Sequence, residues 1–140
     1  MSFRRRRSAL YVPASNARAV DKTRTLPCDV VILDLEDAVV PESKAQGREQ
    51  AVAAVRAGGF GEREVVVRIN GLDTPWGAAD LEAVAAARPA AILVPKVARR
   101  ADLRAYERHL ANCEGVALWA MVETALSIFH VEEIASAAVE

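Results

Sequence analysis

The stretch VILDLEDAVV, residues 31–40, places three acidic residues at the end of a hydrophobic strand. Seven of its ten residues are apolar, which is typical of a buried strand, yet Asp34, Glu36 and Asp37 interrupt the run. Burying an unpaired carboxylate is costly. We therefore expect these acids to lie where the strand leaves the hydrophobic core and meets a polar cavity.

Similar strands recur along the chain and alternate with segments of helical composition, which is the pattern of a parallel α/β fold. Several strands are almost continuously apolar, as expected for a sheet that is covered on both faces. Thr74 and Pro75 are predicted to be the N-cap and first position of the third helix. Strands are predicted at residues 8–13, 30–35, 64–70, 90–96 and 116–123, and helices at 16–26, 41–59, 74–89, 101–112 and from 127 onwards.

Five strand–helix repeats fit either an open doubly wound sheet or a (β/α)8 barrel. Neither GxGxxG nor GxxxxGK[ST] follows any predicted strand, which weakens the nucleotide-binding open sheet. Charged residues recur where the strands end, and in barrels that edge forms the mouth of the active site. We therefore predict an α/β fold of the TIM (β/α)8-barrel type, with about five βα units in a single domain, residues 1–140, and no second domain.

Composition limits the partners of the chain. It has 140 residues, is 52% hydrophobic and carries a net charge of −1, so we expect neither nucleic-acid binding nor a membrane span. The exception is the basic run Arg4 to Arg7, which we interpret as a solvated N-terminal arm. Cys28 and Cys113 are far apart, without metal-ligand spacing, and predict reduced thiols in a cytoplasmic protein.

The acids after the second strand have a functional and a structural interpretation. By the two-residue period of a strand, Asp34 and Glu36 point to one side and Asp37 to the other. They can meet Arg68, Lys96 or a metal ion across the mouth of the barrel. In the structural alternative, Asp37 caps the following turn and Asp34 pairs with a base of a neighbouring strand. Convergent charges in a cleft favour a site for the group as a whole.

Arg68, at the end of the third strand, is the candidate clamp for a substrate carboxylate. Its planar guanidinium matches a carboxylate with two hydrogen bonds and stays charged when partly buried. Asn70 and Gly71 follow it, and a glycine there would let the backbone approach a ligand closely.

Glu123, at the end of the fifth strand, is the candidate metal ligand. Mg²⁺ takes one or two protein carboxylates and fills its other positions with water and substrate oxygens. Lys96 has three interpretations: a Schiff-base lysine, an ammonium that neutralises carboxylates, or, as we favour, a structural partner of an acid from the second strand.

Five ordered blocks of the sequence resemble the HpcH/HpaI aldolase/citrate lyase family, on the side of the citrate lyase β-subunit-like CoA-ester lyases. The resemblance covers nearly the whole chain, and the order of the five blocks makes it specific. The blocks are RSALYVPASNARAVDK (7–22), VILDLEDAVVPESKAQGR (31–48), VVVRINGLDTPWGAADL (65–81), AILVPKV (91–97) and WAMVETA (119–125).

The resemblance implies a TIM barrel, a Mg²⁺ ion and the cleavage or formation of a C–C bond in a hydroxyacyl thioester. The substrates it implies are citryl-, malyl- or citramalyl-CoA, or a citryl acyl-carrier protein, which exchange with an acyl thioester and a small keto acid. A homo-oligomer, either a trimer or a hexamer, is also expected.

The same resemblance assigns roles to residues. Arg68 would bind the carboxylate of the keto acid, with Asn70 beside it, and Glu123 would be the first metal ligand. Glu36 and Asp37 would act near the outer shell of the metal. The block that contains Asn16, Arg18 and Lys22 would lie near the phosphate-bearing arm of the thioester.

Barrels of this family are about twice as long and place a second metal-binding aspartate after the sixth strand, so we expect this chain to hold about five of eight strands. It would then be a fragment or a truncated gene product, or another chain would supply the rest. Two alternatives to the Mg²⁺-dependent lyase stay open: a Schiff-base aldolase that uses Lys96, and a non-catalytic truncated barrel that acts as a binding or assembly partner.

Overall fold

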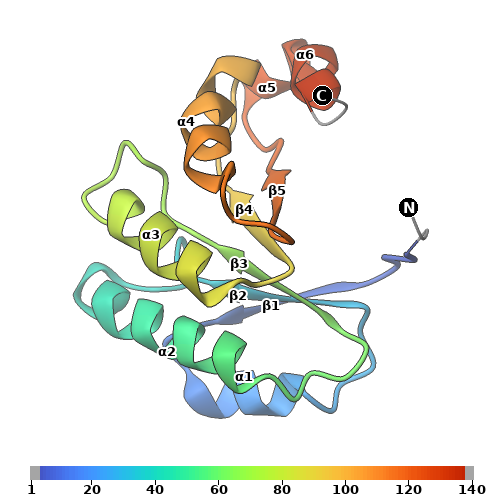
Figure 1. Cartoon of the computed structure of the whole chain (residues 1–140), viewed down its shortest axis with the longest axis vertical. Coiled ribbons are helices and arrows are strands. Elements are labelled where there is room, and N and C mark those ends of the chain that lie inside the picture. The colour runs from blue at the N-terminus through green and yellow to red at the C-terminus, as the bar shows by residue number, and fades with distance from the viewer. Residues whose placement is uncertain (1–3, 138–140) are drawn as a thin grey trace.

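The computed structural model describes residues 4–137, and its strands form one parallel sheet (Figure 1). The strands pair strictly in chain order, β1-β2-β3-β4-β5, and every pair is parallel. This order confirms the barrel-type architecture, because a doubly wound sheet reverses its order at a switch point. The strands are β1 Ala9–Pro13, β2 Val30–Asp34, β3 Glu64–Arg68, β4 Ala91–Val94 and β5 Ala117–Ala120.

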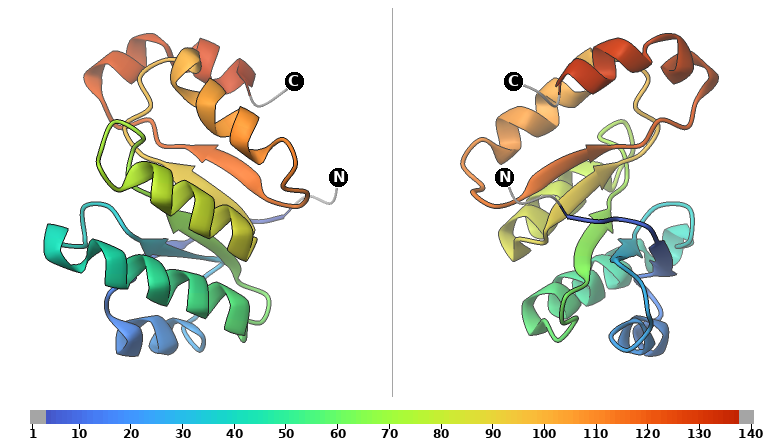
Figure 2. Two further views of the ribbon diagram at one scale, coloured as in Figure 1. Left: turned by 60° about the vertical axis from the view of Figure 1, so that its left-hand side comes forward. Right: turned by 90° about the vertical axis from the view of Figure 1, so that its right-hand side faces the viewer.

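The helices that connect the strands cover the convex side of the curved sheet (Figure 2). They are α1 Ala17–Thr23, α2 Lys44–Ala57, α3 Gly77–Ala87 and α4 Arg100–Leu110. A short 3-10 turn, Pro41–Ser43, precedes α2, so the helix predicted at 41–59 begins with this turn and has a proline at its first position. After β5 come α5 Ala125–Phe129 and α6 Val131–Ser136.

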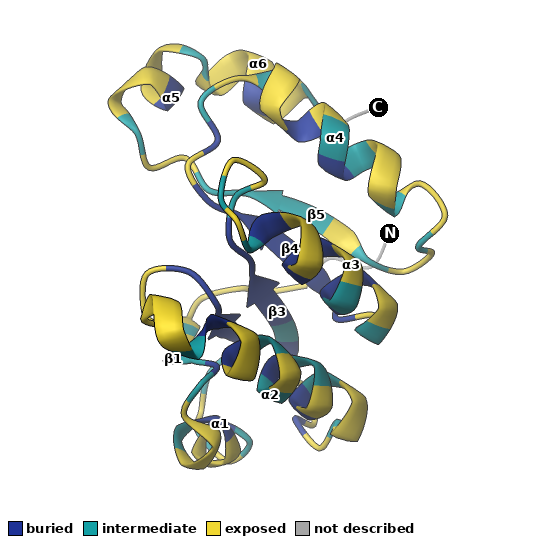
Figure 3. Cartoon of the chain, turned by 90° about the vertical axis from the view of Figure 1, so that its left-hand side faces the viewer, coloured by how far each residue is buried: buried dark blue, intermediate teal, exposed yellow. Residues whose placement is uncertain are grey.

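Alternate residues of β2 to β5 enter two different apolar clusters, as the period of two requires. Leu33, Val67 and Ile92 face the helices and form the larger cluster with residues such as Leu81 and Leu103. The other face of the sheet carries a smaller cluster of Val30, Ile32, Val66, Ala91 and Leu93, against which Trp119 and Met121 pack. The inner sides of the helices are accordingly buried and their outer sides are exposed (Figure 3).

The strand register places Asp34 and Arg68 opposite each other on neighbouring strands. Asp34, the last residue of β2, pairs in register with Arg68, the last residue of β3. Both side chains belong to the same face as Ile32 and Val66, two residues earlier on each strand. The carboxyl ends of the strands therefore meet at one edge, as predicted.

The first three helices are shorter than predicted, with ends that differ by up to three residues, and the starts of α3 and α5 have a visible cause. Helix α3 starts at Gly77 and not at Pro75, because the Thr74 hydroxyl donates to the Gly71 carbonyl at 2.7 Å and holds a turn instead of capping the helix. The predicted helix from residue 127 is two helices, which meet at His130, and it begins at Ala125. Thr124 caps α5 by accepting from the Ser127 amide. Residues 138–140 of the predicted helix lie outside the described part of the chain.

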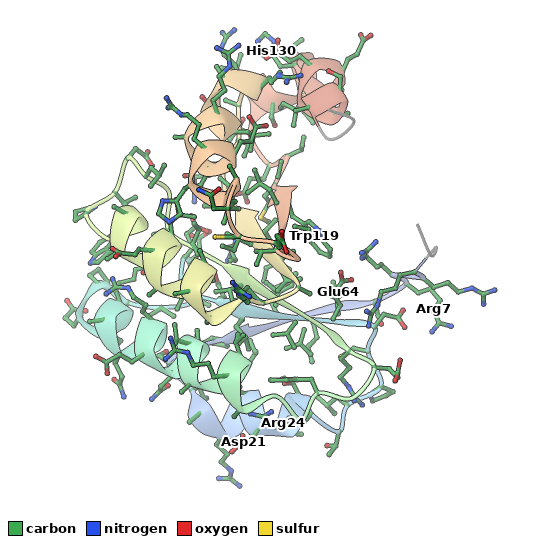
Figure 4. All side chains as sticks on the ribbon, viewed as in Figure 1. Arg7, Asp21, Arg24, Glu64, Trp119 and His130 are labelled. Atoms are coloured by element: carbon green, nitrogen blue, oxygen red, sulfur yellow. The ribbon has the colours of Figure 1, made fainter. Side chains whose placement is uncertain are left out.

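The basic arm is exposed to solvent, as predicted, and ion pairs also hold it against the sheet. Arg6 donates two hydrogen bonds to the buried Glu64 at 2.6 and 2.9 Å, and its guanidinium stacks 5.1 Å from the centre of the Trp119 ring. Arg7 forms a two-point contact with Asp29. Figure 4 shows Glu64 and Trp119 near this arm. Ion pairs thus tie the segment to the amino-terminal ends of the strands.

Two smaller predictions concern the cysteines and the membrane. Cys28 and Cys113 are both free thiols. Within residues 4–137, no helix is both long and apolar enough to cross a bilayer.

Candidate functional site

The centre of the site is a buried ion pair between the ends of β2 and β3. Arg68 Nε donates to Asp34 Oδ1 at 2.7 Å, and Arg68 Nη2 donates to Asp34 Oδ2 at 2.6 Å. Burial opposes ionisation of Asp34, but the bonds from Arg68 and from two backbone amides outweigh it, and the pKa of Asp34 lies below its ordinary value. The hydrogen bonds to Asp34 likewise raise the pKa of Arg68. Pairing of Asp34 with a base of a neighbouring strand was the structural alternative, and it is confirmed.

Asp34 also shapes the loop that follows β2. Its Oδ1 accepts the Glu36 amide at 2.9 Å, and its Oδ2 accepts the Ala38 amide at 3.0 Å. The chain therefore turns around the Asp34 carboxylate directly after the strand. This turn carries Glu36 into the site and leaves Asp37 exposed. The strand ends at Asp34, so the predicted alternation does not extend to Glu36 and Asp37, and both acids contact Lys96.

Glu36 bridges the two bases of the site. Its Oε1 forms an ion pair with Lys96, and its Oε2 lies 3.1 Å from Arg68 Nη1. The geometry of the second contact is not that of a hydrogen bond, and no described residue donates one to Oε2, although this atom is buried. An anionic oxygen without a donor retains its capacity to accept a proton, a hydrogen bond or a cation.

Lys96 joins the ends of β4 and β5 to this network. Its amide donates to Glu123 Oε1 at 2.9 Å, and its ammonium lies 3.6 Å from Asp37 Oδ1. The hydrogen bond to Glu36 and the surrounding acids raise the pKa of Lys96. Its φ is +53°, a left-handed conformation that non-glycine residues seldom adopt and that recurs at functional sites. The structural pairing that we favoured for Lys96 is confirmed.

A cavity of about 490 Å³ opens beside this network, between the loops that follow β3 and β4. Its charged lining residues are Glu36, Lys96, Asp73 and Asp102, while Leu72, Val94 and Tyr106 contribute apolar surface. The Tyr106 hydroxyl accepts the Leu72 amide at 3.0 Å and so ties the first loop to α4. The volume lies within the range of small-molecule sites.

The inner face of β1 forms another wall of the site. The Tyr11 ring packs against the Arg68 guanidinium, 5.1 Å from ring centre to carbon, and its hydroxyl contacts Met121 Sδ at 3.8 Å. Burial raises the pKa of the Tyr11 hydroxyl, and the charge of Arg68 opposes that shift.

Not every predicted residue reaches this space. Arg18 and Lys22 lie on the exposed face of α1, and among the described residues no hydrogen bond or ion pair connects them with Arg68 or Glu36. Asn70 is buried under the loop, where it bonds to Lys44 and Asp80. The structure brings together Arg68, Glu36, Asp37 and Glu123.

Sequence reasoning missed three residues: Lys44, Asp80 and Tyr11. Asp80 offered a usable signal, since it is a carboxylate beside Leu81 on the side of α3 that faces the core. The burial of Lys44 contradicts the usual exposure of a lysine at the start of a helix. Nothing in the sequence indicates which of the two sheet faces Tyr11 occupies.

The carboxylates of the site fit a magnesium ion that has few protein ligands and is completed by water or substrate oxygens. Glu36 has a buried oxygen to which no described residue donates, and Glu123 uses only Oε1 in the hydrogen bonds of the described chain. Mg²⁺ often takes only one or two protein carboxylates. No group of three or more histidine, cysteine or acidic residues among residues 4–137 has the arrangement to enclose a metal. The fit is therefore to a cation that also needs water or substrate oxygens.

Curated relatives act on malyl-CoA compounds. The chain is 46% identical over 93% of its length to a (3S)-malyl-CoA thioesterase of Cereibacter sphaeroides (strain KD131 / KCTC 12085). It is 38% identical over 94% of its length to an L-malyl-CoA/beta-methylmalyl-CoA lyase of Cereibacter sphaeroides (strain ATCC 17025 / ATH 2.4.3). It covers 45% and 44% of these proteins, so the chain spans less than half the length of the curated relatives it matches.

Among solved structures, the fold resembles a citrate lyase beta subunit from M. tuberculosis complexed with oxaloacetate and magnesium. The TM-score is 0.71 at 35% identity, over 92% of this chain and 52% of that one. The family model of HpcH/HpaI aldolase/citrate lyase matches residues 7–140. This match agrees with the five parallel βα units in barrel order and with the charged network at their carboxyl ends. The chain therefore belongs to the HpcH/HpaI aldolase/citrate lyase family.

Proposed function

We propose that this protein cleaves, and in reverse forms, the C–C bond of a malyl-CoA-type 3-hydroxyacyl thioester. The observation that carries the proposal is the convergence of Arg68, Glu36, Lys96 and Glu123 from the ends of four successive strands and the loops behind them. Glu36 and Lys96 of this group line the cavity. Cleavage of malyl-CoA between its hydroxyl-bearing carbon and its methylene group yields glyoxylate and acetyl-CoA.

Arg68 would hold the carboxylate of the oxo acid. Its Nε–Nη2 edge is bound to Asp34, which fixes the guanidinium plane, so the substrate would meet the Nη1–Nη2 edge. The contacts of Nη1 with Met121 Sδ at 3.7 Å and Glu36 Oε2 at 3.1 Å mark the direction of that edge. A guanidinium with two edges can serve a structural and a substrate carboxylate together.

Glu36 would accept the proton of the substrate hydroxyl. Removal of that proton lets the C–C bonding electrons pass to the thioester, where they form an enolate that is later protonated to the acyl-CoA. The Oε2 atom is buried and accepts no hydrogen bond from the described residues, which supports it as the acceptor. The Lys96 ammonium, whose pKa is raised, would balance the negative charge of the site.

Magnesium is the cofactor we propose, and Glu123 would hold it, with water and substrate oxygens at its other positions. The bound ion would polarise the hydroxyl and carboxylate oxygens of the substrate. The raised pKa of Lys96 opposes the Schiff-base alternative, because that chemistry needs a neutral amine. CoA thioesters and a small oxo acid are thus the proposed partners, and the cytoplasm is the proposed location.

A second candidate is hydrolysis of the thioester of malyl-CoA, which gives malate and free CoA. The observation in its favour is the 46% identity to a (3S)-malyl-CoA thioesterase. Both candidates place the same substrate in the same cavity and differ in the bond that breaks.

Product analysis separates these reactions. The purified protein is incubated with (3S)-malyl-CoA and Mg²⁺, and the four products are quantified by liquid chromatography with mass spectrometry. Glyoxylate and acetyl-CoA in equal amounts are expected. If only malate and CoA form, the protein is a thioesterase and not a lyase. If neither pair of products forms and the substrate stays intact, the proposal is overturned.

A further inference from the structure

Lys44 is a buried lysine whose ammonium is fully hydrogen-bonded outside the cavity. Its Nζ donates to the Leu35 carbonyl at 2.8 Å, to the Glu36 carbonyl at 2.6 Å and to Asn70 Oδ1 at 2.8 Å. An ammonium has three protons to donate, so each has an acceptor here. The Trp76 ring covers the group from 5.2 Å.

These bonds fix the peptide groups that carry Glu36. The Glu36 amide is bound to the Asp34 side chain at 2.9 Å, and the Glu36 carbonyl is bound to Lys44. The preceding Leu35 carbonyl accepts from both Lys44 and Asn70 Nδ2, the latter at 3.0 Å. The backbone at the root of the Glu36 side chain is therefore held on both sides.

The hydrogen bonds around Lys44 continue through Asn70 to side chains of α2 and α3. Asn70 donates from Nδ2 to Asp80 Oδ2 at 2.6 Å, and Arg48 Nε donates to Asp80 Oδ1 at 2.7 Å. Asp80 is completely buried on α3, while Lys44 and Arg48 belong to α2. The loop after β2 is thereby joined to the loop after β3 and to both helices behind them.

From this geometry we infer that Lys44 is a positioning residue, which holds residues 35 and 36 so that the Glu36 carboxylate reaches both Arg68 and Lys96. The inference rests on the proposed function insofar as Glu36 acts on the substrate. The ammonium does not line the cavity, so Lys44 acts through the backbone and not on the reacting atoms. Burial lowers the pKa of Lys44, and the surrounding acids, Asp34 and Glu36 first among them, counteract that shift.

The test replaces Lys44 by methionine, which keeps most of the length of the side chain and removes all three donors. Loss of positioning is expected to lower kcat by about 100-fold, the cost of a displacement near 1 Å, and to leave KM for malyl-CoA within about threefold. In hydrogen exchange followed by mass spectrometry, peptides that cover residues 35–40 should exchange at least about tenfold faster in K44M, whereas those that cover β3 should keep their rates.

Glu64→Gln is the matched control. Glu64 is also a buried charged residue and forms its ion pair with Arg6 at the opposite end of β3. This variant should lose thermal stability as K44M does, while kcat and the exchange of residues 35–40 stay at wild-type values. The comparison separates positioning from general destabilisation.

Each outcome decides the inference. Wild-type kcat in K44M, or unchanged exchange of residues 35–40, would overturn it. If K44M does not fold, NMR of the wild-type protein with ¹⁵N-labelled lysine decides: the chain has three lysines, and absence of a slowly exchanging ammonium signal would overturn the inference. If the wild-type protein does not turn over malyl-CoA, the proposed function fails, and the exchange data still decide whether Lys44 positions the loop.

Discussion

Arg68 and Asp34 face each other across β2 and β3 and share two hydrogen bonds of 2.7 and 2.6 Å. Both side chains are buried, with 8% of the Arg68 and 1% of the Asp34 side chain exposed, so water could not solvate either charge if its partner were removed. The pair answers the question that the acidic strand end raises: Asp34 is a buried carboxylate that is fully compensated.

Replacing Arg68 or Asp34 alone should lower the free energy of unfolding far more than replacing both. We expect Arg68→Met to lower the free energy of unfolding by about 3–5 kcal/mol, because it leaves Asp34 buried and unpaired. The double variant Arg68→Met with Asp34→Leu should recover part of this loss. Urea unfolding of the two single variants and the double variant measures the coupling, and strictly additive losses would contradict the prediction.

The same pair should make stability depend on pH at the acid end. The folded pKa of Asp34 is lowered, so its contribution is complete above the unfolded value of about 3.9 and is lost as the pH falls through the folded value. The free energy of unfolding of Asp34→Asn should therefore fall less steeply than that of wild type below about pH 4. Parallel curves in urea titrations at a series of pH values would show that Asp34 is not the source.

Lys96 should not form a Schiff base. Its ammonium is paired with Glu36 and its pKa is raised, so little neutral amine is present near pH 7. Borohydride reduction in the presence of glyoxylate should leave the Lys96 peptide unmodified, as measured by peptide mass mapping. Stoichiometric labelling of Lys96 would instead restore the aldolase alternative.

Turnover should depend on magnesium and on Glu123. A chelator is expected to abolish malyl-CoA cleavage, and added Mg²⁺ should restore it. Glu123→Gln should raise the half-saturating Mg²⁺ concentration by more than about tenfold, since even outer-shell partners of metal ligands change affinity by about 10–100-fold. Glu114→Gln, an exposed acid in the loop before β5, serves as the control. Equal Mg²⁺ dependence of the two variants would remove Glu123 from the metal site.

Two glycines near the site should respond to alanine in opposite directions. A Cβ at Gly77 would lie 2.1 Å from the Gly71 carbonyl oxygen, so Gly77→Ala must displace the loop that lines the cavity and should cost about 1–3 kcal/mol. At Gly47, inside α2, the nearest atoms lie at 3.5 Å, and Gly47→Ala should gain up to about 1 kcal/mol. Thermal unfolding measures both, and a stabilised Gly77→Ala would refute the clash.

The fold could be predicted because its signals are local and repeated. Five apolar strands alternate with helices, and residues 30–34 are buried on both faces, as their continuous hydrophobicity predicts. The boundary of α3 could not be predicted in this way. Its start depends on the contact between Thr74 and Gly71 and on the close approach of Gly77 to the same backbone, neither of which is a property of the helix itself.

The candidate site was predictable in position but not in its connections. The charged residues at the strand ends indicated Arg68, Glu36, Lys96 and Glu123, since parallel strands end at a common edge. Which acid pairs with which base depends on the register of β2 and β3 and on the turn that follows β2. The resemblance placed Arg18 and Lys22 near the substrate, and their exposure on α1 leaves that role a prediction.

The sequence by itself determined the βα repeat, the edge at which the charges gather and the family of the chain, because hydrophobic periodicity and ordered motifs are written in neighbouring residues. Only the tertiary structure decided that Asp34 occupies one edge of Arg68, that Glu36 keeps a buried oxygen to which no described residue donates, and that Lys44 supports the loop from behind. The contacts of Lys44 with Glu36 and of Asp34 with Arg68 join residues 8 and 34 positions apart in the chain. Packing brings such residues together, and the cost of leaving a buried charge without a partner selects the pairs that persist.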